Sequence, residues 1–321
     1  MAGEVPKRAT ANRPVVINIV EEGNEMNDKA IEQSSAQSHA EQVYRAHVDH
    51  DQLSLATADE TFRHRLDSGS IDWWRHKRLW EPVFSCLSHT KEQTWLTVGD
   101  TYGSDAFQMM REGFKHVLPS SIDSVMLDEA KRRGYIENFS VENAEALSFK
   151  DNSFDYVLCR EAYHHFPRPM IALYEMLRVA RKGVVLIEPQ DPMIDHPAIV
   201  GDVPSGYEAS ANYVYTLSRR ELTKVALGLD LHVMACRGLF DTYRDEIAKN
   251  RAEDSDPEFV KYRQEIERCE QECAQKQRKH SYLLAILYKE RPADVRLDQF
   301  SADWTVTFFP GNPYLAKNRQ P

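Results

Sequence analysis

This chain of 321 residues has little of what several classes of protein require. It holds no apolar run near the roughly 18 residues of a membrane helix. Its formal net charge is −10, with 50 acidic and 40 basic residues, so it offers no excess of basic charge for nucleic acid. No apolar segment follows the charges at Lys7 and Arg8, which is unlike a signal peptide. We therefore expect neither a membrane nor a nucleic acid as partner.

Cysteine is also sparse, and no two of the five cysteines form a CxxC pair. An odd number at wide spacing predicts reduced thiols and a cytoplasmic protein rather than a disulfide framework or a zinc site. A second group, His47-Val-Asp49-His50-Asp51, contains residue types that bind metals. Its members crowd one helical turn with no second cluster at a defined spacing. We interpret them as a solvated helix face and predict no metal site.

Changes in composition divide the chain into four parts. Residues 1–40 are polar and weakly patterned, which predicts a mobile leader. Residues 41–90 predict a helical cap, because Trp73, Trp80 and Phe84 recur at spacings typical of one helix face. Residues 91–290 form the main domain, with an irregular lid or substrate loop at 189–215 and a charge-rich helical insertion at 244–279. Residues 291–321 are a C-terminal extension whose aromatic run, 304–309, is expected to dock on the domain.

Short apolar runs alternate with helical segments through the main domain. This alternation predicts an α/β fold with a doubly wound, seven-stranded, mostly parallel sheet. Ser218 and Glu221 form a capping box that predicts a helix to about Leu227. The expected strands are Thr94–Val98, His116–Leu118, Phe139–Val141, Phe154–Cys159, Gly183–Glu188, Leu231–Ala235 and Tyr282–Tyr288.

Ligands of such sheets bind at the carboxyl ends of the strands. Around the fourth strand, the stretch from Ala144 to Phe166, followed by Ala172 to Gly183, resembles the class I S-adenosylmethionine-dependent methyltransferases. Within that class it is similar to the methyltransferase type 11 group, and the resemblance covers about residues 94–190. It implies a Rossmann-like methyltransferase fold and S-adenosylmethionine as the cofactor.

The resemblance also implies which residues contact the cofactor. Thr101 stands where the family has the middle glycine of its first loop, so a side chain occupies a place meant for close backbone approach. Ser121 stands where the family has an acidic residue that takes both ribose hydroxyls, and losing a charged hydrogen bond costs about 1.5–3 kcal/mol of binding free energy. Asn143 replaces an aspartate but keeps a carbonyl acceptor. The implied cofactor residues are Gly99, Asp100, Thr101, Gly103, Ser121, Ile122, Asn143, Ala144, Glu145 and Arg160.

Three residues after the fourth strand are candidate catalytic bases. His164 and His165 lie beside the place that the resemblance gives to the methyl group, and an unperturbed histidine has a pKa of about 6.5. One of the two can equally be structural. Glu161 is a rival base, and Arg160 can meet an acidic substrate or form a local ion pair. Glu188, after the fifth strand, is a candidate for orienting the substrate or for capping the next segment.

We consider three functions. The first is methyl transfer to a small-molecule acceptor, with O-methylation of a sugar or another metabolite favoured. The second is a catalytically silent interaction or scaffold protein on the same fold, which Thr101 and Ser121 motivate. A nicotinamide-dependent oxidoreductase fares worst, because Gly99 and Gly103 do not give G-x-G-x-x-G and no acidic residue closes the second strand. Pairing of the 244–279 helix with a second copy of the chain stays open.

Overall fold

The computed structural model describes residues 25–66, 69–191, 213–312 and 314. It divides the chain into two units, Met1–His39 and Ala40–Pro321. Helix α1 (Glu25–Ser54) begins in the first unit and continues into the second. Residues 25–40 of the expected leader are therefore helical, and residues 1–24 lie outside the described part of the chain.

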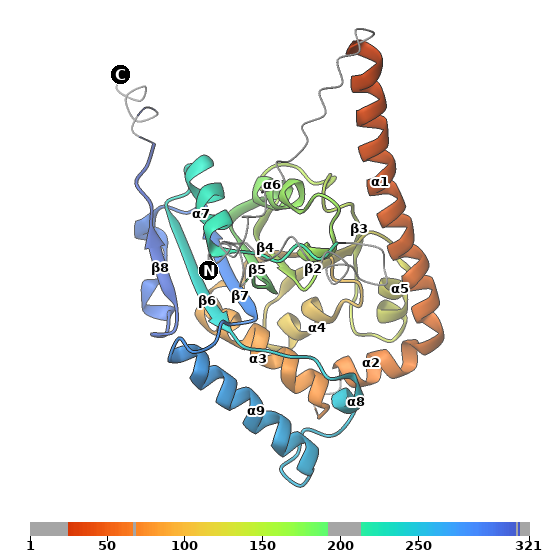
Figure 1. Ribbon diagram of the computed structural model, residues 1–321, viewed down its shortest axis with the longest axis vertical. Helices are drawn as coiled ribbons and strands as arrows, with labels where there is room; N and C mark the ends of the chain where they lie inside the picture. The colour runs from red at the N-terminus through yellow and green to blue at the C-terminus, as the bar shows by residue number, and fades with distance from the viewer. Residues whose placement is uncertain (1–24, 67–68, 192–212, 313, 315–321) are drawn as a thin grey trace, which may run out of the picture. The chain divides into compact units, whose positions relative to one another are not determined.

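The second unit is built on one twisted sheet. Among the described residues, eight strands run in the order β3-β2-β1-β4-β5-β7-β6-β8 (Figure 1). The first five of these pair in parallel, and β7, β6 and β8 continue the sheet in antiparallel pairs. The strands are β1 (Thr94–Val98), β2 (His116–Ser121), β3 (Ser140–Val141), β4 (Phe154–Arg160), β5 (Ala180–Pro189), β6 (Val233–Leu239), β7 (Tyr282–Tyr288) and β8 (Thr305–Phe308).

The expected count of seven strands is one too low. The aromatic run of the C-terminal extension does more than dock, because β8 pairs antiparallel with β6, with Cys236 opposite Thr305 and Val233 opposite Phe308. Without β8, strand β6 would present its unpaired backbone groups along an open edge. The four residues of β8 pair with part of that edge. A strand this short is missed when the sequence is searched for longer apolar runs.

Helices cover both faces of the sheet, as the prediction of a doubly wound fold requires. On β4, Val157 and Cys159 point to the face packed by α6 (Pro169–Val179) and α7 (Arg219–Gly228). Tyr156 and Leu158 point to the opposite face, packed by α3 (Ile71–Cys86) and α4 (Ser104–Arg111). Because successive strand residues face opposite sides, a strand covered on both faces is apolar throughout.

The remaining helices agree with the sequence in part. The capping box is confirmed, with Ser218 and Glu221 capping each other at the start of α7. The charged insertion is two helices, α8 (Asp245–Ala248) and α9 (Pro257–Ala274), because Asp256 caps the second one by accepting from the backbone of Glu258 and Phe259. The remaining α-helices of the described residues are α2 (Ala58–Leu66) and α5 (Val125–Arg132). Most of the expected lid, residues 192–212, lies outside the described residues.

The strand order reverses direction at β1, which has β2 on one side and β4 on the other. The chain leaves β1 for β2 and later returns to β4, so the connections at this point run to opposite sides of the sheet. A crevice forms outside the carboxyl ends of such strands. Within the ranges described, no helix is both long enough and apolar enough to cross a membrane.

Candidate functional site

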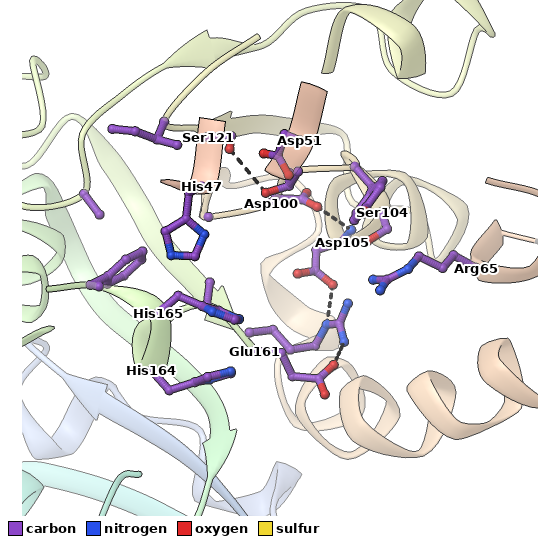
Figure 2. A pocket seen from close by; sticks show the side chains of 18 of the residues that line it. His47, Asp51, Arg65, Asp100, Ser104, Asp105, Ser121, Glu161, His164 and His165 are labelled. Carbon is purple, nitrogen blue, oxygen red and sulfur yellow. Dashed lines mark hydrogen bonds and ion pairs between the residues drawn. The ribbon is translucent and has the colours of Figure 1, made fainter. Parts of the chain in front are cut away.

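A cavity of about 530 Å³ opens at the carboxyl ends of β1, β2 and β4. Small-molecule sites typically have volumes of about 300–1,000 Å³. We call the loops that follow these strands the sheet wall (residues 99–105, 121–122, 142–144 and 160–166). The predicted site residues on it are Gly99, Asp100, Thr101, Ser121, Ile122, Ala144, Arg160, Glu161, His164 and His165 (Figure 2).

Three helices form the opposite side of the cavity. Helices α1, α2 and α3 contribute what we call the cap wall, and its residues are Tyr44, His47, His50, Asp51, Arg65, Asp72, Arg75 and His76. None of these was predicted as a cofactor or catalytic residue. The one sequence signal for this part of α1 was the His47–Asp51 cluster, which the sequence pattern led us to interpret as a solvated helix face. His47, His50 and Asp51 line the cavity instead. The described residues include no group of three or more side chains suited to a metal ion.

The first loop of the sheet wall brings backbone close to the cavity at Gly99. Its φ is +73°, and a Cβ there would lie 2.4 Å from the Cβ of Ala162. Only glycine fits both the left-handed backbone and the close approach of the β4 loop. Gly103, also left-handed at φ +63°, caps α4 outside the cavity lining, where a Cβ would approach Ile136.

Asp100 organises this loop with its side chain. Its carboxylate accepts hydrogen bonds from the backbone N–H of Asp105 and Ala106 at 3.2 and 3.0 Å and from the Thr97 hydroxyl at 2.9 Å. Burial raises the pKa of Asp100, and these hydrogen bonds oppose the rise. A carboxylate with these partners positions the start of α4 rather than reaching into the cavity.

Two of the residues that depart from the family pattern, Thr101 and Ser121, lie next to each other. The Thr101 and Ser121 hydroxyl oxygens are 3.4 Å apart, and Ser121 is buried at the end of β2. The shorter side chain of serine leaves room at this end of the cavity, and neither hydroxyl carries a charge.

Two predicted cofactor residues after β3 do not line the cavity. The Asn143 side chain turns back to accept from the backbone N–H of Glu145 at 2.9 Å. Glu145 in turn accepts from the Arg168 backbone and forms an ion pair with its side chain at 2.6 Å. Because Glu145 is buried in this pairing, its carboxylate serves the local loop.

Glu161 and Arg160 belong to a buried ion-pair network. Arg160 pairs with Asp105 at 2.5 Å and with Glu161, while Arg75 of α3 donates to Glu161 at 2.7 Å. Burial alone would raise the pKa of Glu161, but the Arg75 and Arg160 guanidinium groups hold it well below its ordinary value. Such a strongly stabilised carboxylate is a poor proton acceptor, which disfavours Glu161 as the base. Its φ of +48° is a strained backbone conformation at the cavity edge.

His164 is held by Glu188, which is fully buried. The imidazole Nδ1 lies 2.6 Å from Glu188 Oε2, while Oε1 accepts from the backbone N–H of Ala162 and Tyr163, each at 3.0 Å. With Nδ1 as donor to the carboxylate, Nε2 is the nitrogen with the lone pair. Glu188 therefore fixes His164 instead of facing a substrate. The His165 ring lies 4.2 Å from that of His164 and at an edge-on 5.4 Å from His47.

Two charged side chains near the cavity keep an unused polar atom. Arg65 of α2 stacks over the Tyr102 ring at 4.6 Å, and its Nε is buried without a hydrogen-bond partner among the described residues. Asp123, just past β2, accepts from the backbone of Val125 through Oδ1, while its Oδ2 is buried with no partner in the described ranges. A ligand with both an acidic group and hydroxyl donors would satisfy both kinds of atom.

Comparisons with known proteins show what the segment that carries this site is similar to. Residues 96–187 match the family model described as "Methyltransferase domain". The uncharacterized methyltransferase YcgJ of Bacillus subtilis is 38% identical over 73 residues, 21% of this chain and 28% of that protein. A ubiquinone/menaquinone biosynthesis C-methyltransferase, UbiE, of Roseobacter denitrificans is 28% identical over 130 residues, 38% of this chain and 52% of that protein.

This chain thus spans about a quarter of one curated relative and half of the other. The crystal structure of YcgJ from Bacillus subtilis superposes with a TM-score of 0.41 at 20% identity, over 64% of this chain and 95% of that one. The matched segment contains β1 through most of β5, the strands whose carboxyl ends form the sheet wall. Residues 96–187 thus match a methyltransferase domain, and they lie in the parallel part of an α/β fold.

Proposed function

We propose that this protein transfers a methyl group from S-adenosylmethionine to a hydroxyl of a small molecule, a sugar or another metabolite. The observation that carries the proposal is that two different features line one cavity. The close-approach loop at Gly99 and the His164 imidazole, which Glu188 holds, both lie on its sheet wall. A cofactor and a proton acceptor can therefore meet in the same space.

The residues present fit the cofactor. The Gly99 loop admits close backbone approach, and Ser121 and Ile122 lie where adenosine would enter. The unpartnered Nε–H of Arg65 would donate to the carboxylate of the amino-acid portion. When bound, the cofactor supplies an electrophilic methyl group on a sulfonium.

His164 is the residue best placed to take the proton of the acceptor. Glu188 holds its Nδ1, so the tautomer with the lone pair on Nε2 is stabilised and an imidazolium would be stabilised further. A hydroxyl acceptor needs such a base, because it must lose its proton as the new bond forms. A cavity of about 530 Å³ favours a small acceptor over an extended polymer.

Calorimetric titration with S-adenosylhomocysteine tests the cofactor, and mass spectrometry of sugar and metabolite mixtures incubated with S-adenosylmethionine tests transfer. We expect binding, a mass increase of one methyl group, and a loss of turnover of about a hundredfold or more in H164Q with cofactor binding retained. H89Q is the control, because His89 precedes β1 and does not line this cavity. Absence of binding at millimolar ligand would contradict the proposal.

The silent-protein alternative has one observation in its favour. Thr101 and Ser121 occupy both positions where the family pattern is broken, and their hydroxyls are directed to each other. This alternative predicts that the parent chain does not bind S-adenosylhomocysteine and that the T101G/S121D double variant does. Tight binding by the parent would exclude it.

A further inference from the structure

The end of β2 lacks the charge that a ribose would use. Ser121 is buried there, and its hydroxyl lies near that of Thr101. A ribose presents two neighbouring hydroxyls, and a carboxylate can accept from both at once. Two neutral hydroxyls cannot replace such a group, so a site that binds adenosine tightly needs an acceptor from another element.

Helix α1 brings a carboxylate to this end of the cavity. Asp51 lines the cavity together with Ser121 and Thr101, and only 7% of its surface is exposed. Figure 2 shows Asp51 next to Asp100 and on the same side of the cavity as Ser121, away from His164. The residue lies far outside the segment 96–187 that the methyltransferase-domain model matches.

The surroundings of Asp51 differ from those of other buried acids at the cavity. Asp105 has Arg160 at 2.5 Å, and Asp72 has His64 at 2.9 Å. Asp51 instead faces a second acid, Asp123: burial first, and then this neighbour, raise the pKa of Asp51 to about 7.

No N–H or hydroxyl group of the described residues donates to the buried Oδ2 of Asp123. Asp51 and Asp123 instead form a side-chain hydrogen bond with each other, so a proton held between the two carboxyl groups takes the place of an opposite charge. Neutral hydroxyl donors relieve this arrangement without requiring a further charge. A sugar diol supplies two of them at the spacing that one carboxylate accepts.

We propose that Asp51 of α1 accepts the ribose hydroxyls of the cofactor, in place of the acidic residue that is absent at Ser121. This inference rests on the proposed function. The acceptor has moved from the end of a strand to a cap helix, and the small Ser121 side chain leaves space for it. Helix α1 therefore completes a binding site that the sheet wall leaves unfinished.

A charge-relocation experiment tests the proposal. S-adenosylhomocysteine and 5′-methylthioadenosine, which both carry the ribose, are titrated into the full chain and into D51N, S121D and D51N/S121D. We expect D51N to weaken both ligands about tenfold to a hundredfold. S121D in the D51N background should restore most of the affinity. D49N is the matched control, because Asp49 is an exposed acid on the same helix.

The outcomes separate the two proposals. If the parent binds and D51N binds equally well, the role of Asp51 is overturned while the proposed function stands. If D51N is weak but S121D does not restore binding, Asp51 acts on the shape of the cavity and the proposal also fails. If the parent binds neither ligand at millimolar concentration, both proposals fall. A thermal unfolding midpoint of D51N at or above that of the parent establishes that this variant is folded.

Discussion

The two walls of the cavity differ in how they hold their charges. On the sheet wall, polar side chains mostly serve the fold: Asp100 caps α4 and Glu188 orients His164. On the cap wall, Asp51 faces another acid in place of an opposite charge, and the Arg65 Nε–H has no acceptor among the described residues. The sheet wall builds the shape of the site, and the cap wall supplies charges for a ligand.

Arg75 of the cap wall differs from Asp51 and Arg65, because it links the two walls. It donates to Glu161 of the sheet wall, to Tyr282 at 3.1 Å and to Asp241 just after β6. The cap-wall residues therefore fall into two groups. Some bind the sheet wall, and others have groups available to a ligand. Substitutions of the first kind should reduce stability, and substitutions of the second kind should reduce affinity.

The largest expected effect is that of R75M. Removing a buried guanidinium leaves Glu161 with Arg160 and Asp241 with Arg78, so each acid loses one of its cations. This loss should lower the free energy of unfolding by about 3 kcal/mol. Urea denaturation measures this loss. R296M removes one partner of an exposed pair with Asp298 and should leave the midpoint unchanged. An R75M midpoint equal to that of the parent would show that Arg75 does not join the walls.

The next largest loss of stability is expected for G99A, a substitution on the sheet wall. The new Cβ would meet Ala162 at 2.4 Å on a left-handed backbone, so we expect a loss of about 2 kcal/mol or more together with loss of cofactor binding. G134A has a similar φ of +78° with no atom within 4 Å, so it isolates the backbone strain, about 1 kcal/mol. Equal losses in the two variants would mean that close packing at Gly99 has no special importance.

A smaller effect is expected from R65Q, which tests the charge on α2. It should weaken S-adenosylhomocysteine about tenfold and leave 5′-methylthioadenosine unchanged, because only the first ligand has a carboxylate. R63Q on the same helix, where the side chain is exposed, is the control. Equal weakening of both ligands in calorimetry would place Arg65 away from the amino-acid end.

A separate prediction concerns pH. Because the pKa of Asp51 is raised to about 7, the folded protein retains a proton that the unfolded chain has lost between about pH 4 and pH 7. Stability from this group therefore falls as pH rises through that window. Asparagine does not titrate, so the unfolding temperature of D51N relative to the parent should be higher at pH 8 than at pH 5. A pH-independent difference would mean that neither burial nor Asp123 raises the pKa of Asp51.

The sequence by itself determined the parallel sheet, the capping box at Ser218 and the gathering of His164, Gly99 and Ser121 at one edge. These follow from periodicity and from the rule that parallel strands end together, which are local or general properties. Boundaries were less certain: the sixth strand was expected at Leu231–Ala235 and runs over Val233–Leu239.

Only the tertiary structure decided which polar residues were already committed to the protein. Glu145 and Glu188 carry the same charge in the sequence as Asp51 does, yet Arg168 and His164 hold the first two while Asp51 meets another acid. The partner of a side chain lies tens or hundreds of residues away along the chain, so no local pattern records it. Burial and pairing, which together set the charge that remains for a ligand, exist only once α1–α3 lie against the sheet edge.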